Sequence, residues 1–71
     1  MKNQILFELT DEYIELCHLL KITGVICSGG EAKHAITTGL VAVDGQIELR
    51  KKCKIRAGQS VKFEATIIQV K

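Results

Sequence analysis

The sequence has no proline, no tryptophan and only three aromatic side chains among its 71 residues. Without proline, the strongest marker of helix and strand ends is missing. The aromatic residues Phe7, Tyr13 and Phe63 lie far apart in the sequence, which gives no indication of an aromatic platform for stacking nucleobases. We expect both phenylalanines to belong to the hydrophobic core.

Long hydrophobic runs are also absent. The chain reaches Glu8 after the three-residue apolar run Ile5–Phe7, which is too short for a signal peptide, and no segment is long enough to span a bilayer. The three cysteines, Cys17, Cys27 and Cys53, are odd in number and form no C-x-x-C pair. This pattern matches no small disulfide framework and favours a cytoplasmic protein without membrane contact.

The sequence does contain enough apolar material for one core. Hydrophobic residues make up 46% of the chain, and its mean hydropathy is +0.16. A chain of this length is too short for two cores. We therefore expect residues 1–71 to form a single domain and a monomer. Because the apolar side chains are needed for packing, function is expected on the surface.

The charged residues are distributed unevenly, although the net charge is only +2. Residues 1–32 contain two lysines and five acidic residues, a net charge of −3. Residues 33–71 contain eight cationic and three acidic residues, a net charge of +5. This asymmetry predicts a basic region suited to binding phosphates.

A strand and a first helix are predicted in the first third of the chain. Residues 4–9 form a short, mainly apolar segment, which is typical of a strand. Thr10 has the position of an N-cap, and Asp11 and Glu12 suit the positive end of a helix dipole. Apolar residues then recur at helical spacing until Gly24, which suits the end of a helix.

A second helix and a hairpin follow. Ser28 and Glu31 have the spacing of a capping box, which predicts a helix that ends at Gly39. The dipeptide Asp44–Gly45 is typical of a two-residue hairpin turn. The strands predicted around it and after it are residues 40–43, 46–49, 61–63 and 67–70. This order of elements predicts an α+β fold.

The segment Arg50–Arg56 carries five cationic side chains within seven residues. Such a segment can pair with several phosphates, and the release of their counterions makes binding fall steeply with salt. An ordinary solvated loop fits the same residues equally well. Lys33 and His34 lie near the start of the second helix, where backbone donors and the helix dipole favour an anion.

Patterns for catalysis or metal binding are weak. Cys17 and His18 are neighbours on a predicted helix, where adjacent side chains diverge, and His34 lies apart from them. Cys53 lies among cations that would lower the pKa of its thiol, so a reactive thiol is an alternative to a structural one. The chain has no G-x-S-x-G elbow or phosphate-binding Gly-Lys loop. We therefore expect no enzymatic activity, no metal and no cofactor.

The run from Ser28 to Phe63 resembles the RNA-binding domain named after ribosomal small-subunit protein S-four. The residues that fall on the family pattern are Leu16, Leu20, Gly24, Ser28, Ala32, Lys33, Ile36, Gly39, Val41, Val43, Gly45, Gly58 and Val61. The chain contains little besides this domain, and it is similar to the stand-alone bacterial members of the YbcJ type. The resemblance implies a two-helix αL RNA-binding motif packed on a small, mainly antiparallel sheet. It also implies that the helices and the adjoining hairpin loop form the RNA-binding surface.

Three positions depart from the family pattern. Gly29 replaces an arginine, Glu15 replaces a basic residue of the first-helix motif, and Asp44 replaces an asparagine of the hairpin. The RNA contacts that the family makes with these two cations are not expected in this chain. We therefore expect most RNA contacts from the second helix and from the segment after the hairpin. The residues expected to contact RNA are Ser28, Lys33, His34, Arg50, Lys51, Lys52, Lys54 and Arg56.

The sequence thus predicts a protein that recognises structured RNA, ribosomal or transfer RNA, mainly by phosphate and shape contacts. The alternative is a protein-interaction module that docks a ribosomal or RNA-processing protein through its acidic first helix or its hairpin.

Overall fold

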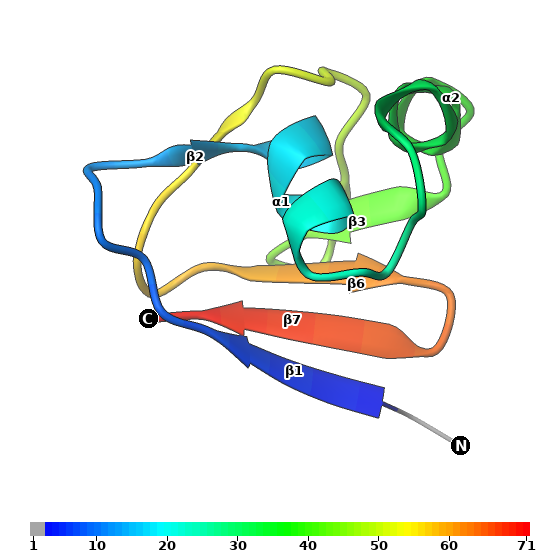
Figure 1. Ribbon diagram of the computed structural model, residues 1–71. Coiled ribbons are helices and arrows are strands. Elements are labelled where there is room, and N and C mark those ends of the chain that lie inside the picture. Colours follow the sequence, from blue (N-terminus) through cyan, green and yellow to red (C-terminus); the bar gives the residue numbers. More distant parts are fainter. Residues whose placement is uncertain (1–2) are drawn as a thin grey trace.

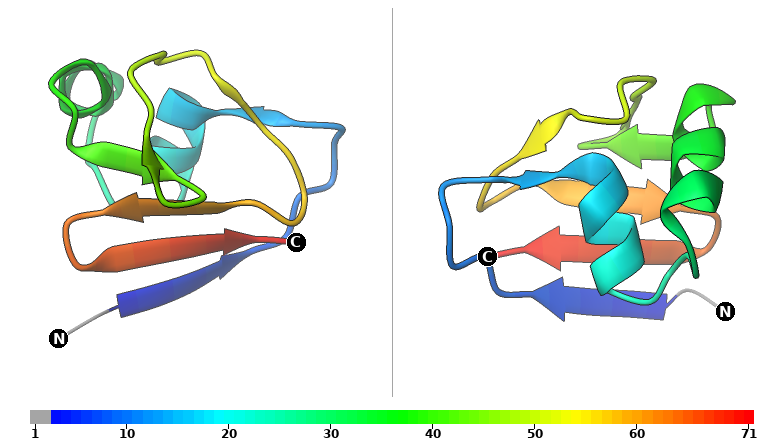
Figure 2. Two further views of the ribbon diagram at one scale, coloured as in Figure 1. Left: turned by 180° about the vertical axis from the view of Figure 1, so that it is seen from behind. Right: turned by 45° about the horizontal axis from the view of Figure 1, so that its top comes forward.

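The computed structural model describes residues 3–71. Its elements are β1 (Asn3–Phe7), β2 (Ile14–Glu15), α1 (Leu16–Ile22), α2 (Gly29–Thr37), β3 (Val41–Val43), β4 (Gln46–Ile47), β5 (Lys54–Ile55), β6 (Ser60–Phe63) and β7 (Thr66–Val70). Five strands form one sheet in the order β1-β7-β6-β3-β4, and β2 pairs with β5. Both helices lie on one face of the larger sheet (Figures 1 and 2).

The sheet is antiparallel except at one edge, where β1 runs parallel to β7. The predicted strands at residues 4–9, 61–63 and 67–70 correspond to β1, β6 and β7. The structure therefore confirms the predicted α+β fold with two helices on a mainly antiparallel sheet.

The core lies between this sheet and the two helices. Val61 is paired with Ile68 in the β6–β7 register, so their side chains share one face of the sheet. Both are buried, and α1 and α2 cover them with leucine, alanine and isoleucine side chains. Full burial of a Leu or Ile side chain contributes about 1.5–3 kcal/mol to the stability of the folded state. Phe7 and Phe63 pack against this core, as predicted.

The first helix begins later than predicted. Its first residue is Leu16 and its N-cap is Glu15, so the assignment of Thr10 as the N-cap is wrong. The backbone of Ile14–Glu15 pairs instead with Lys54–Ile55. This pairing joins segments far apart in the sequence, and it overrides the local helical pattern. The predicted end of the helix is confirmed, since Gly24 follows it with a left-handed φ of +78°.

The second helix and the hairpin agree with the prediction. Ser28 Oγ accepts a hydrogen bond from the amide of Glu31 at 3.2 Å, which confirms Ser28 as the N-cap of α2. The structure, which describes both residues, has no reciprocal hydrogen bond from the Ser28 amide to the Glu31 carboxylate. Asp44 and Gly45 have φ angles of 50° and 84°, as a two-residue turn between β3 and β4 requires.

Candidate nucleic-acid interface

Residues 48–53 connect β4 to β5 and are called the basic loop. The loop lies beside the amino-terminal end of α1, on the side of the molecule furthest from β1 (Figure 1). The carbonyl of Cys53 accepts a hydrogen bond from the Leu16 amide at 2.9 Å, and the carbonyl of Lys51 accepts one from the Cys17 amide at 3.1 Å. These amides belong to the first turn of α1, whose N-cap side chain makes no capping bond. The main chain of the basic loop thus serves as the cap of α1.

An ion pair within the basic loop fixes its first turn. The Glu48 carboxylate accepts hydrogen bonds from Arg50 Nε at 3.0 Å and Nη2 at 3.2 Å, and a third from the Arg50 amide at 3.0 Å. These donors lower the pKa of Glu48 to about 2, and the carboxylate in turn raises the pKa of Arg50. Of the three cations in the basic loop, Arg50 is therefore already engaged by a carboxylate.

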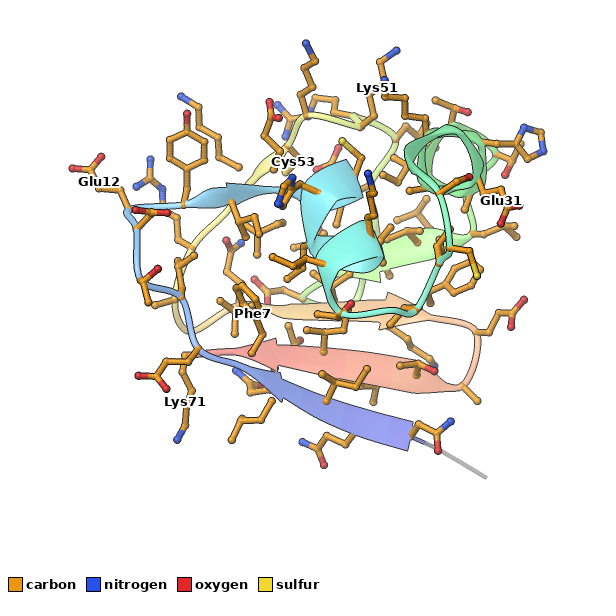
Figure 3. The ribbon with its side chains drawn as sticks, viewed as in Figure 1. Phe7, Glu12, Glu31, Lys51, Cys53 and Lys71 are labelled. Atoms are coloured by element: carbon orange, nitrogen blue, oxygen red, sulfur yellow. The ribbon has the colours of Figure 1, made fainter. Side chains whose placement is uncertain are left out.

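Lys51 and Lys52 occupy the tip of the basic loop. Both side chains are exposed, and Lys51 extends outward, away from the sheet (Figure 3). Within residues 3–71, Arg50 and Glu48 form the only ion pair between oppositely charged side chains. The charges of these two lysines are therefore available to an external anion.

Lys54 and Arg56 contact an aromatic ring that the sequence patterns missed. Lys54 Nζ lies 4.9 Å from the centroid of the Tyr13 ring, and Arg56 Cζ lies 6.0 Å from it. The predicted first helix included Tyr13, whereas the structure places it just before β2. No local signal in the sequence indicates this contact, because it arises from the pairing of β2 with β5.

The environment of Cys53 differs from the prediction. Burial raises the pKa of its thiol, and the neighbouring Glu48 carboxylate raises that pKa further. The expectation that surrounding cations lower this pKa is therefore wrong. The physical reason is that the lowering effect of Arg50 on the pKa of this thiol is outweighed by burial and by Glu48.

The predicted residues of α2 also reach the surface. Lys33 and His34 are both exposed, outside the face of α2 that buries Ala32 and Ile36. α2 and the basic loop lie at the same end of the molecule in every view (Figures 1 and 2). Glu31 occupies the first turn of α2 and reduces the attraction of this helix end for an external anion.

The three departures from the family pattern have separate structural settings. A Cβ at Gly29 would meet no atom within 4 Å, so the missing arginine is a lost surface charge rather than a response to crowding. Glu15 is half-buried in β2. Asp44 accepts hydrogen bonds from the Ser60 amide at 2.9 Å and from Gln59 Nε2 at 3.2 Å, so its carboxylate holds the hairpin to the turn before β6.

Residues 3–71 contain neither a metal-binding cluster nor a membrane-spanning helix. No group of three or more His, Cys, Asp or Glu side chains in this part of the chain is arranged to hold a metal ion. None of its helices has the length and apolar character needed to cross a membrane.

Comparison with known proteins identifies close relatives. The model of the S4 domain family matches residues 7–71. A protein of Escherichia coli (strain K12) named "Putative RNA-binding protein YbcJ" is 53% identical over 58 residues, which cover 82% of this chain and 83% of the relative. A protein of Shigella flexneri named "Uncharacterized protein YbcJ" has the same identity and coverage.

A solved structure supports the same relationship. The solution structure of YbcJ from E. coli, described as revealing an αL motif involved in RNA binding, matches with a TM-score of 0.74 at 49% sequence identity. The match covers 99% of this chain and 90% of that chain. The fold, the sequence relatives and the family model agree, and the chain belongs to the S4 domain family.

Proposed function

We propose that this chain is a cytoplasmic, monomeric, single-domain protein that binds structured RNA, with ribosomal and transfer RNA as the candidate classes. The family membership and the name of the E. coli relative support a binding protein rather than an enzyme. The thiols of Cys17, Cys27 and Cys53 are all free, which supports a reducing compartment.

The observation that carries the proposal is the combination of a fixed main chain and exposed cations in the basic loop. Hydrogen bonds to Leu16 and Cys17 hold the loop backbone, while Lys51 and Lys52 extend into solvent. A loop that is already ordered pays less conformational entropy when it binds. The basic loop is thus prepared to contact several phosphates at once.

Residues of α2 extend this surface. Lys33 contributes a charge, and His34 can donate a hydrogen bond to a phosphate oxygen. Ser28 Oγ accepts a hydrogen bond from Glu31, and its hydroxyl proton remains available to a phosphate. Contacts of this kind recognise the shape and the backbone of a folded RNA rather than its base sequence.

The test is a titration with a transfer RNA transcript and with a ribosomal RNA stem-loop at two salt concentrations. The double variant Lys51→Ala, Lys52→Ala should bind both RNAs more weakly. The negative slope of the logarithm of the association constant against the logarithm of the salt concentration should become shallower by about 0.7–0.9 per lost phosphate contact. The matched control, Lys62→Ala with Lys71→Ala, removes the same charge from exposed sites outside the basic loop. Equal losses in the two variants would contradict the proposed surface.

A second candidate function, docking of a ribosomal or RNA-processing protein, is supported by exposed apolar side chains near the hairpin. Leu40, Ile47 and Leu49 are each more than half exposed. Leu40 also borders a groove of about 470 Å³ between residues 25–27 and α2. Protein docking alone predicts no saturable binding of either RNA, so the same titration separates the two functions.

A further inference from the structure

Tyr13 lies beside two cations on the surface formed by β2 and β5. Its side chain is 39% exposed, with Lys54 Nζ at 4.9 Å and Arg56 Cζ at 6.0 Å from the ring. Because side chains alternate along a strand, the burial of Ile55 directs Lys54 and Arg56 to the opposite, outer face. The pairing of Ile14 with Ile55 then brings Tyr13 next to Arg56.

Neither of these two cations forms an ion pair with a carboxylate of residues 3–71. Glu15 is the pairing partner of Lys54 in the β2–β5 register, but the two side chains form no ion pair within the described part of the chain. Lys54 lies on the Tyr13 ring instead. The main chain at Arg56 is held in place, since its amide donates a hydrogen bond to Gln59 Oε1 at 2.7 Å.

This arrangement offers one surface for a base and two charges for its phosphate. A nucleobase stacks on an exposed ring more strongly than an ammonium group binds there. A base can therefore displace Lys54 from the ring, and the released ammonium group can pair with a phosphate. A base within a duplex is already stacked on its neighbours, so only an unpaired base can use the ring.

We propose that Tyr13, Lys54 and Arg56 form a binding site for one unpaired nucleotide of the RNA. This inference rests on the proposed RNA-binding function and names the part of the RNA that this surface recognises. The nucleotide would lie beside the structured region held by the basic loop, which leads directly into β5.

The acidic residues around Tyr13 limit the direction from which the nucleotide approaches. Asp11, Glu12 and Glu15 line a concave region that Tyr13 and His18 also border. Glu12 and Lys51 lie at separate parts of this surface (Figure 3). Phosphates are repelled from the acidic side, so the RNA backbone must reach Tyr13 from the side of the basic loop.

The test compares an RNA stem-loop with a blunt duplex that has the same stem. Tyr13→Leu should weaken binding of the stem-loop by about 5- to 100-fold, because a stacked base is lost. Its affinity for the duplex should be unchanged, and Tyr13→Phe should bind both RNAs like the wild type. Since stacking releases no counterions, Tyr13→Leu should keep the salt slope, whereas Lys54→Ala should reduce it by about 0.7–0.9.

A direct readout is available because Tyr13 is the only tyrosine. Its ring protons should shift in NMR spectra when the stem-loop is added and should stay in place with the duplex. Unchanged stem-loop affinity in Tyr13→Leu would overturn the nucleotide site, and so would equal losses for both RNAs. A different result, no binding of either RNA by the wild type, would contradict the proposed RNA-binding function itself.

Discussion

The amide of Cys17 donates a hydrogen bond to the carbonyl of Lys51 at 3.1 Å. This bond joins the first turn of α1 to the tip of the basic loop, and the bond from Leu16 to Cys53 lies beside it. The start of the helix and the shape of the loop therefore depend on each other. We therefore expect a change in either segment to affect the other, which would couple the core helix to the proposed RNA-binding surface.

Hydrogen exchange should detect this coupling. The amides of Leu16 and Cys17 lie in the first turn of a helix, where donors normally lack partners and exchange quickly. Because both are bonded to the basic loop, they should exchange about tenfold or more slowly than the Gly30 amide in the first turn of α2, after correction for intrinsic rates. Equal protection of the three amides in NMR exchange measurements would show that the loop does not cap α1 in solution.

The parts of the fold that the sequence predicts correctly are those with local signals. Asp44–Gly45 favours a hairpin turn whatever the rest of the chain does, and Ser28 caps the helix that follows directly. The start of α1 has no such signal. Its cap is supplied by Lys51 and Cys53, and a pattern of neighbouring residues contains no information about that pairing.

The same limit applies to the candidate site. The sequence alone identifies Arg50–Arg56 as a basic segment, and its cationic residues are exposed in the structure. The sequence does not show that Glu48 engages Arg50, or that Tyr13 meets Lys54. The first contact depends on the path of the basic loop, and the second depends on the pairing of β2 with β5, the strand that follows this loop.

The pH dependence of stability should reveal the pair of Glu48 and Arg50. The pKa of Glu48 is lowered from 4.5 to about 2, first by the Arg50 side chain and then by its amide. A carboxyl group with a lowered pKa in the folded state stabilises the fold above its unfolded pKa, and this contribution is lost as the pH falls through the folded pKa. Glu48→Gln should therefore lower the urea midpoint at pH 7, and its difference from the wild type should disappear as the pH falls from 4.5 to about 2.

The control for this measurement is Glu8→Gln, because Glu8 is exposed and forms no ion pair within residues 3–71. It should leave the urea midpoint almost unchanged at pH 7. A constant difference between Glu48→Gln and the wild type from pH 7 to pH 2 would mean that the carboxylate charge of Glu48 does not stabilise the fold.

Alkylation should distinguish the three cysteines. Cys27 is exposed, whereas Cys17 and Cys53 are partly buried. Burial and Glu48 raise the pKa of Cys53, and the thiolate is the form that reacts. With limiting iodoacetamide near neutral pH, mass spectrometry should find Cys27 modified first. Modification of Cys53 before Cys27 in the folded protein would contradict this order, and urea should reduce the difference between the two sites.

Two glycine substitutions should change stability in opposite directions. A Cβ at Gly30 or at Gly24 would meet no atom within 4 Å, so neither alanine creates a clash. Gly30 lies within α2, where alanine is favoured over glycine by up to about 1 kcal/mol. Gly24 has a φ of +78°, which an alanine adopts only with strain. Gly30→Ala should therefore raise the free energy of unfolding by about 0.5–1 kcal/mol, and Gly24→Ala should lower it by about 1 kcal/mol or more.

Urea denaturation of the two variants measures this difference directly, because each adds the same methyl group to open space. RNA affinity should be unchanged in Gly30→Ala, since the proposed contacts centre on the basic loop and on exposed side chains rather than on the backbone of the first turn of α2. A large loss of affinity in this more stable variant would show that RNA approaches the main chain at Gly30. The binding surface would then include the main chain between Ser28 and Lys33 in addition to the side chains of Ser28, Lys33 and His34.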